Sequence, residues 1–156
     1  MGSRARDRVV SVAVDRHHGT MVDVDQVQRF LDENFAPWVC ALGPQVTDVG
    51  PDGVSLDIPI TPQIARVGGI VSGQALATLA DTAMVLAVGA HLGRMLPVAT
   101  VTLDTQFLRP GAGDAIRAHA TVTRAGRALA FAQCQLIALP SRKDVALATA
   151  TFALPA

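Results

Sequence analysis

The residue that stands out for its chemistry is Asp81, a carboxylate inside an otherwise apolar stretch. The sequence around it reads ATLADTAMVLAV. Burying a carboxylate is costly, and aspartate is only a middling helix former. A residue that is unfavourable both locally and in the fold is typical of a functional site. The alternative is that the helix restarts at this point and Asp81 only caps the residues from Thr82 onward.

A second candidate, Gly73, opens the same stretch two turns before Asp81. A helix N-terminus presents free N–H groups and a positive dipole end, and glycine lets a ligand approach that backbone closely. Such a helix start can polarise a carbonyl group or bind an oxyanion, although a glycine here is also simple loop punctuation. Eight residues at 1.5 Å each separate Gly73 from Asp81 by ~12 Å. Two such helices packed antiparallel in a dimer would bring one chain's Gly73 near the other chain's Asp81.

The elements that must position these two residues follow from periodicity. Apolar spacing predicts an amphipathic helix over 23–36, stopped by Pro37, and a nearly all-apolar helix over 73–92. A glycine-containing loop, 61–73, precedes the second helix. Alternating patterns and turn signals predict strands over 45–50, 54–60, 101–107, 116–123, 128–139 and 145–154. Short turns between the last four strands favour an antiparallel sheet, and the apolar helix is its natural cover. The predicted class is therefore α+β, with about six curved strands around one long buried helix and a short N-terminal helix.

Length and composition limit the function. The 156 residues suit one domain, expected over 21–156 after a flexible leader, 1–20. Thirteen basic and thirteen acidic residues balance, which argues against a nucleic-acid partner. Asp81 near the centre of the longest apolar stretch argues against a membrane span. The two cysteines, Cys40 and Cys134, suit a reducing, cytoplasmic location. High apolarity without a span indicates self-association.

Three segments together resemble one known family. They read GIVSGQALATLADTAMVLAV, ATVTLDTQFLRPG and TRAGRALAF. They are similar to the hotdog-fold acyl-CoA thioesterases of the phenylacetate-pathway (PaaI-like) group, within the 4-hydroxybenzoyl-CoA thioesterase superfamily. The likeness covers roughly residues 45–154, and it implies a hotdog fold and hydrolysis of acyl-CoA to CoA and a carboxylic acid.

The resemblance carries roles onto particular residues. Gly73 falls on the first glycine of the family's His-Gly-Gly helix start, and its N–H would polarise the thioester carbonyl. Asp81 falls on the family's acid, which would act from the partner subunit as general base or as nucleophile. Thr100 stands where relatives use Ser or Thr to hold the attacking water. Departures occur at the histidine position, which is Ser72, and at the second glycine, which is Gln74.

The resemblance also implies how the substrate is held. Arg66 stands near a position where relatives often have Asn or Gln. Arg109, Arg124 and Arg127 lie at strand ends and turns, where cations would meet the phosphates of coenzyme A. Ser72 or Gln74 would add a hydrogen bond near the thioester. The resemblance implies a homodimer or a homotetramer built as a dimer of dimers, with no metal and no cofactor beyond the CoA of the substrate.

Two other functions stay open. One is an acyl-CoA-binding hotdog protein that has lost turnover, which the departures at Ser72 and Arg66 keep in play. The other is a hotdog enzyme of the enoyl-CoA hydratase type. Those enzymes usually pair a histidine with an acid, and the sequence has no histidine between Arg66 and Asp81.

Overall fold

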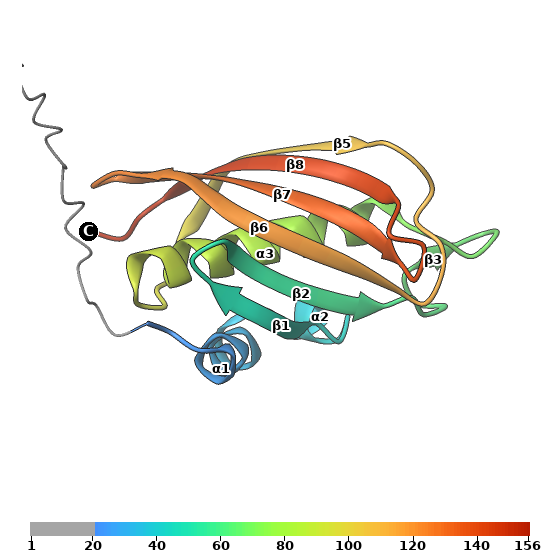
Figure 1. The fold of residues 1–156 in the computed structure, drawn as a ribbon, viewed down its shortest axis with the longest axis horizontal. Helices are drawn as coiled ribbons and strands as arrows, with labels where there is room; N and C mark the ends of the chain where they lie inside the picture. The colour runs from blue at the N-terminus through green and yellow to red at the C-terminus, as the bar shows by residue number, and fades with distance from the viewer. Residues whose placement is uncertain (1–20) are drawn as a thin grey trace, which may run out of the picture.

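A computed structural model describes residues 21–156 of the chain. The predicted leader, residues 1–20, lies outside the described residues. The predicted α+β class is confirmed: one six-stranded antiparallel sheet curves along the long helix α3 (Figure 1). This is the hotdog fold.

The six strands follow the order β1-β2-β6-β7-β8-β5, and every neighbouring pair is antiparallel. Their bounds are Gln45–Gly50 (β1), Gly53–Pro59 (β2), Ala99–Phe107 (β5), Ala115–Ala125 (β6), Leu129–Leu139 (β7) and Asp144–Ala153 (β8). Each predicted strand is therefore present, with ends shifted by at most two residues. The loop before α3 contains a small two-stranded sheet that the sequence did not predict, β3 (Ala65–Arg66) and β4 (Ile70–Val71).

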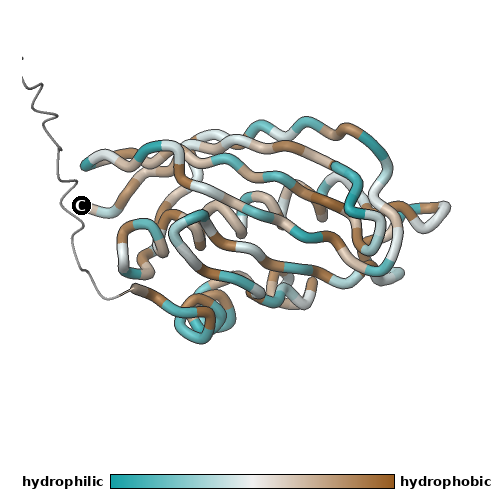
Figure 2. The backbone as a smooth tube through the Cα atoms, viewed as in Figure 1, coloured by the Kyte–Doolittle hydropathy of each residue, from teal (hydrophilic) through white to brown (hydrophobic). Residues whose placement is uncertain are grey.

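Period-two alternation puts one side of the sheet in the core. Along β7, residues Ala130, Ala132, Cys134 and Leu136 are buried, whereas the residues between them are exposed. The same alternation is visible along the strands in Figure 2. Small alanines dominate this inner face, so the sheet approaches the helix closely and curves around it.

The helix α3 spans Gly73–Leu92 without interruption. Its N-cap is Ser72, whose hydroxyl accepts a hydrogen bond from the Ala75 N–H at 3.3 Å. It ends at Gly93, whose φ of 72° is in the left-handed region that favours glycine. Because the helix is continuous, the alternative in which it restarts at Asp81 is wrong. By length and composition α3 would suffice to cross a membrane, but it packs mainly on β6, β2 and β7 and most of it is buried.

The N-terminal helix α1 (Val24–Asn34) closes the β1 side of the sheet. Asp23 and Gln26 form a reciprocal capping box at its start, which fixes the predicted boundary. Gln28 accepts a hydrogen bond from the Val46 N–H at 2.7 Å, so the helix also covers part of the free edge of β1. A one-turn helix, α2 (Pro37–Cys40), follows directly, because proline is tolerated in a first helical turn.

The other edge of the sheet is uncovered. Eight of the nine residues of β5 are exposed, including apolar side chains on it such as Val101 and Phe107. The strand has a β-bulge between Thr100 and Thr102. An edge strand with exposed apolar groups is a natural pairing surface.

Candidate active site

The structure joins two of the predicted site residues directly. The Thr100 hydroxyl donates a hydrogen bond to the Asp81 carboxylate, with 2.9 Å between Oγ1 and Oδ1. Thr100 pairs with Phe152, a fully buried core residue of β8, and so lies on the face of β5 that meets α3. Asp81, about two and a half turns from the N-cap of the helix, is only partly exposed. A carboxylate and a hydroxyl from different elements therefore meet at the open edge of the sheet.

The surroundings of Asp81 change its acidity. Burial among apolar residues raises the pKa of Asp81 above its ordinary value of 3.8, and the Thr100 hydrogen bond lowers the pKa by a smaller amount. Desolvation makes the ionised carboxylate a better proton acceptor than an exposed aspartate. Perturbed acids of this kind are frequent at functional sites.

Gly73 is the first residue of α3 and lies beside Phe107, at the end of β5 opposite to Thr100. A Cβ placed on Gly73 would lie 3.4 Å from Cζ and 3.5 Å from Cε1 of Phe107. The Phe107 ring therefore points its tip at the Gly73 backbone. The sequence predicted Phe107 only as the end of the strand over 101–107, within a segment that carries the family resemblance, and not as part of this region. The period-two pattern of the strand, which puts Phe107 on the same face as Leu103 and Thr105, was the signal that could have indicated it.

The other residues predicted near the helix start have mixed positions. Ser72 uses its hydroxyl oxygen to cap α3, as described above. Gln74 is exposed in the first turn. Both lie beside Gly73, and whether they contact a substrate remains a prediction.

The four predicted arginines divide into two groups. Arg66 and Arg109 line a hollow of about 370 Å³ together with Gly73, Leu76 and Phe107.

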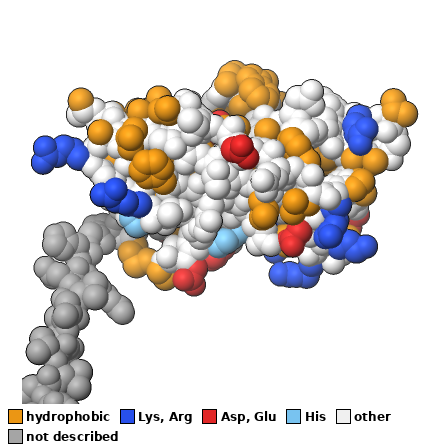
Figure 3. All heavy atoms as spheres, turned by 90° about the horizontal axis from the view of Figure 1, so that it is seen from above, with side chains coloured by type: hydrophobic (Ala, Val, Ile, Leu, Met, Phe, Trp, Pro, Cys, Tyr) orange, Lys and Arg blue, Asp and Glu red, His pale blue; other side chains and the backbone are white. Residues whose placement is uncertain are grey.

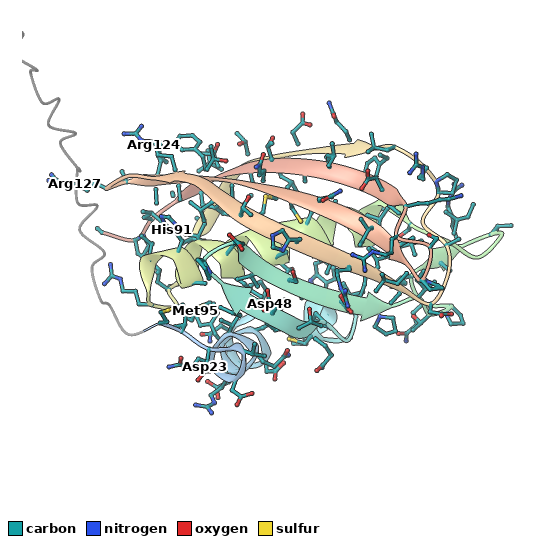
Figure 4. All side chains as sticks on the ribbon, in the orientation of Figure 1. Asp23, Asp48, His91, Met95, Arg124 and Arg127 are labelled. Carbon is teal, nitrogen blue, oxygen red and sulfur yellow. The ribbon has the colours of Figure 1, made fainter. Side chains whose placement is uncertain are left out.

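Arg124, at the end of β6, and Arg127, in the turn before β7, lie at the far end of the molecule, near His91 at the end of α3 (Figure 4). Because the 20-residue helix spans ~30 Å, one protomer does not bring both groups to one end. All four side chains are exposed.

Neither Asp81 nor Thr100 lines any of the three hollows described for residues 21–156. The largest, of about 700 Å³, lies at the C-terminal end of α3 and is lined by His91, Thr121 and the β1–β2 turn. A hollow of about 470 Å³ lies on the outer face of the sheet, away from α3. The carboxylate thus lies at the partly exposed surface between α3 and β5 rather than in one of these hollows.

The outer face of the sheet has its own polar network, apart from Asp81 and Thr100. His119 contacts the Ser55 hydroxyl through Nδ1 at 2.7 Å and the Asp52 carbonyl through Nε2 at 2.8 Å, so its role in the protomer is structural. Arg117 donates two hydrogen bonds to Asp57, at 2.8 and 2.9 Å.

Cys134 is buried, and desolvation raises the pKa of its thiol to about 12. It is therefore a small core residue rather than a nucleophile. Among residues 21–156 there is no group of three or more His, Cys, Asp or Glu that could hold a metal; the absence of a metal from the reaction stays a prediction.

Comparisons with known proteins agree with this geometry. The sequence profile of the thioesterase superfamily matches residues 68–144, which include α3 and β5 to β7. A "putative esterase" from Halobacterium salinarum is 34% identical over 116 residues, covering 71% of this chain and 75% of that protein. The chain belongs to the thioesterase superfamily, and it is a hydrolase that acts on thioesters.

Solved structures give the same result. A "putative thioesterase" from Silicibacter sp. TM1040 superposes with a TM-score of 0.78 and 26% identity, over 90% of this chain and 97% of that one. A "putative thioesterase, phenylacetic acid degradation-related protein" from Ralstonia eutropha superposes with a TM-score of 0.70 and 27% identity, over 82% and 98%. The resemblance seen in the sequence is confirmed.

Proposed function

We propose that this chain hydrolyses acyl-CoA thioesters at a site formed between two copies. The observation that carries the proposal is the partly buried Asp81 on an uninterrupted helix, hydrogen-bonded to Thr100 and two turns from the Gly73 N–H. This arrangement combines a proton acceptor, a hydroxyl that orients it and a backbone donor for a carbonyl oxygen. The phenylacetic acid degradation-related structure supports an arylacetyl group on the acyl-CoA, in which a methylene separates the aromatic ring from the carbonyl carbon.

Geometry supports a dimer. Gly73 and Asp81 are ~12 Å apart on a straight helix, too far to act on one carbonyl carbon. The residues Gly73, Ala77, Asp81 and Val85 form a stripe along α3 that the sheet leaves partly exposed. Next to it, β5 has its apolar side chains in solvent. Figure 3, which looks down on the β5 edge, shows hydrophobic side chains across this face between basic groups at its two ends. A second copy related by a two-fold axis would cover both features and place its Asp81 near this Gly73.

In this dimer, the Gly73 N–H would donate to the thioester carbonyl oxygen and stabilise the negative charge that forms there. By the general-base route, the partner's Asp81 takes a proton from water, the water oxygen attacks the carbonyl carbon, and the C–S bond breaks. The thiolate then takes the proton and leaves as CoA. By the nucleophilic route, Asp81 attacks directly, and water hydrolyses the mixed anhydride. Thr100 holds the carboxylate in either route and orients the water.

The antiparallel arrangement also gives the two arginine groups one role. Arg66 and Arg109 lie at the Gly73 end, whereas Arg124 and Arg127 lie at the other end of the protomer. When the two α3 helices pack antiparallel, the end of the partner subunit that carries its second arginine group lies near the Gly73 end of this protomer. We propose that the cations of both subunits hold the phosphates of one CoA. A homotetramer would pair two such dimers.

A thiol-release assay over short, long and aromatic acyl-CoAs tests the function. Release of free thiol that Asp81→Ala abolishes, while the variant stays folded and dimeric, would support the proposal. Binding of CoA esters without thiol release would instead indicate a non-catalytic acyl-CoA-binding protein. Formation of 3-hydroxyacyl-CoA from enoyl-CoA would indicate the hydratase-type reaction.

The interface has a separate test with a matched control. Val101 is 58% exposed on β5, and Leu147 is 42% exposed on the outer face of the sheet. We expect Val101→Glu to shift the dimer to monomer and to abolish thiol release, as measured by light scattering and activity. Leu147→Glu introduces the same charge on the other face and should keep both the dimer and the activity. If the Val101→Glu variant is monomeric and still releases thiol, the proposal that two copies form the active site together is wrong.

We further propose a cytoplasmic location and no cofactor beyond the substrate's CoA. The location rests on Cys40 and Cys134, both free thiols, which suit a reducing compartment.

A further inference from the structure

The aromatic ring of Phe107 lies beside Gly73, the first residue of α3. Phe107 ends β5 and pairs with the buried Ala146 of β8, so it faces α3 in the same row as Thr105 and Leu103. The ring is nevertheless 55% exposed, because β5 is the edge of the sheet. Within the protomer the ring is therefore not part of the core, and in the proposed dimer it lies on the strand that meets the second copy.

The ring tip faces Gly73 across the space that a side chain at this position would occupy. The three ring atoms Cζ, Cε1 and Cε2 would lie 3.4, 3.5 and 3.8 Å from a Cβ on Gly73. A Cβ at this position would make ordinary van der Waals contact with the ring, and a group bound in the hollow that Gly73 and Phe107 both line would lie next to it. The same ring, with Leu76, Ile70 and Val71, forms the apolar wall of the 370 Å³ hollow at this end of the helix.

We propose that Phe107 determines acyl specificity by limiting the bulk of the group next to the thioester carbonyl carbon. The inference rests on the proposed function, because it is the carbonyl bound at Gly73 that brings the acyl group to the ring. A straight acyl chain can extend past the ring, whereas an α-branched group, or an aryl group on the carbonyl carbon, needs the volume that the ring occupies. Phe107 is thus a specificity-determining residue and takes no part in proton transfer.

The substitution Phe107→Ala removes the ring and should open this volume. A steric difference of one methylene is worth about 10- to 200-fold in kcat/KM. We expect the kcat/KM ratio of benzoyl-CoA and isobutyryl-CoA over butyryl-CoA to rise at least about tenfold. Phe107→Trp, which fills more space, should lower the same ratio. Leu147→Ala removes an exposed apolar side chain from the outer face of the sheet and should leave the ratio unchanged.

The result that overturns the inference is a ratio that stays constant or falls in Phe107→Ala. A wild-type protein without thiol release would refute the proposed function instead. In that case the dissociation constants of the carba(dethia) analogues, in which a methylene replaces the sulfur, are measured by calorimetry. The same shift of the branched-over-straight ratio in Phe107→Ala would support the assignment of Phe107, and its absence would refute it.

Discussion

The sharpest prediction concerns Asp81→Asn, a substitution of nearly equal size that removes the charge and the proton acceptor. Positioned general acid–base groups contribute ~10²–10⁴-fold to rate, so we expect kcat/KM for the best acyl-CoA to fall by about that factor. Because tenfold corresponds to ~1.4 kcal/mol, the activation barrier rises by about 3–5 kcal/mol. The assay is thiol release under conditions where the variant is shown to be dimeric.

The pH profile identifies the group. Burial raises the pKa of Asp81, and only the ionised form accepts a proton. We therefore expect kcat/KM to be low at pH values below this raised pKa and to increase as the pH rises through it. Thr100→Val removes the hydrogen bond that lowers the pKa of Asp81, and the acid limb should therefore move to higher pH. A hydrogen bond to a charged group contributes ~1.5–3 kcal/mol. Because Thr100 is exposed, we expect the lower end, about a tenfold loss at neutral pH.

Stability gives an independent check of the same carboxylate. The folded state binds the Asp81 proton more tightly than the unfolded chain does, so the charge costs stability at pH above the raised pKa. Asp81→Asn should therefore unfold at a higher temperature than the wild type at neutral pH. The gain should disappear as the pH falls below the pKa of the unfolded chain. An Asp81→Asn variant that keeps more than a tenth of the wild-type kcat/KM would refute the catalytic role, whatever its stability.

Three further predictions test other parts of the molecule. Thr105 has a buried hydroxyl oxygen with no hydrogen-bond partner among the described residues, so Thr105→Val should raise the free energy of unfolding by about 1 kcal/mol in urea titrations; a loss would mean that the hydroxyl is bonded in the assembly. Leu31 is a fully buried residue of α1, and Leu31→Ala should lower that free energy by about 2–5 kcal/mol while kcat/KM is kept; lost activity in folded protein would link α1 to the site. Arg127→Glu should raise KM more than it lowers kcat in steady-state kinetics, and equal effects would remove Arg127 from the CoA site.

Local patterns were sufficient for most of the fold. The alternation along 129–139 indicates a strand that is buried on one face, and the apolar run over 73–92 indicates a helix that is buried on nearly all faces. Both patterns are formed by residues that are close together in the chain. The helix ends were also readable, because Pro37 and Gly93 restrict or free the backbone directly. The short helix at 37–40 and the pair β3–β4 were not predicted. Such short elements depend on contacts with distant residues, and they are too short to show a hydrophobic period in the sequence.

The chemistry divides in the same way. The sequence by itself identified Asp81 as a costly residue and Gly73 as a helix start, because charge, size and backbone freedom belong to single residues. It also determined the family, through three segments that match together.

Only the tertiary structure decided which groups meet. The Thr100–Asp81 hydrogen bond, the Phe107 ring against Gly73 and the separation of the arginines into two ends join residues far apart in the chain. These contacts depend on how a curved sheet packs against one helix, and on an edge strand, β5, whose residues are mostly exposed. Packing of this kind arises from the summed shape of the core, so no local pattern in the sequence encodes it.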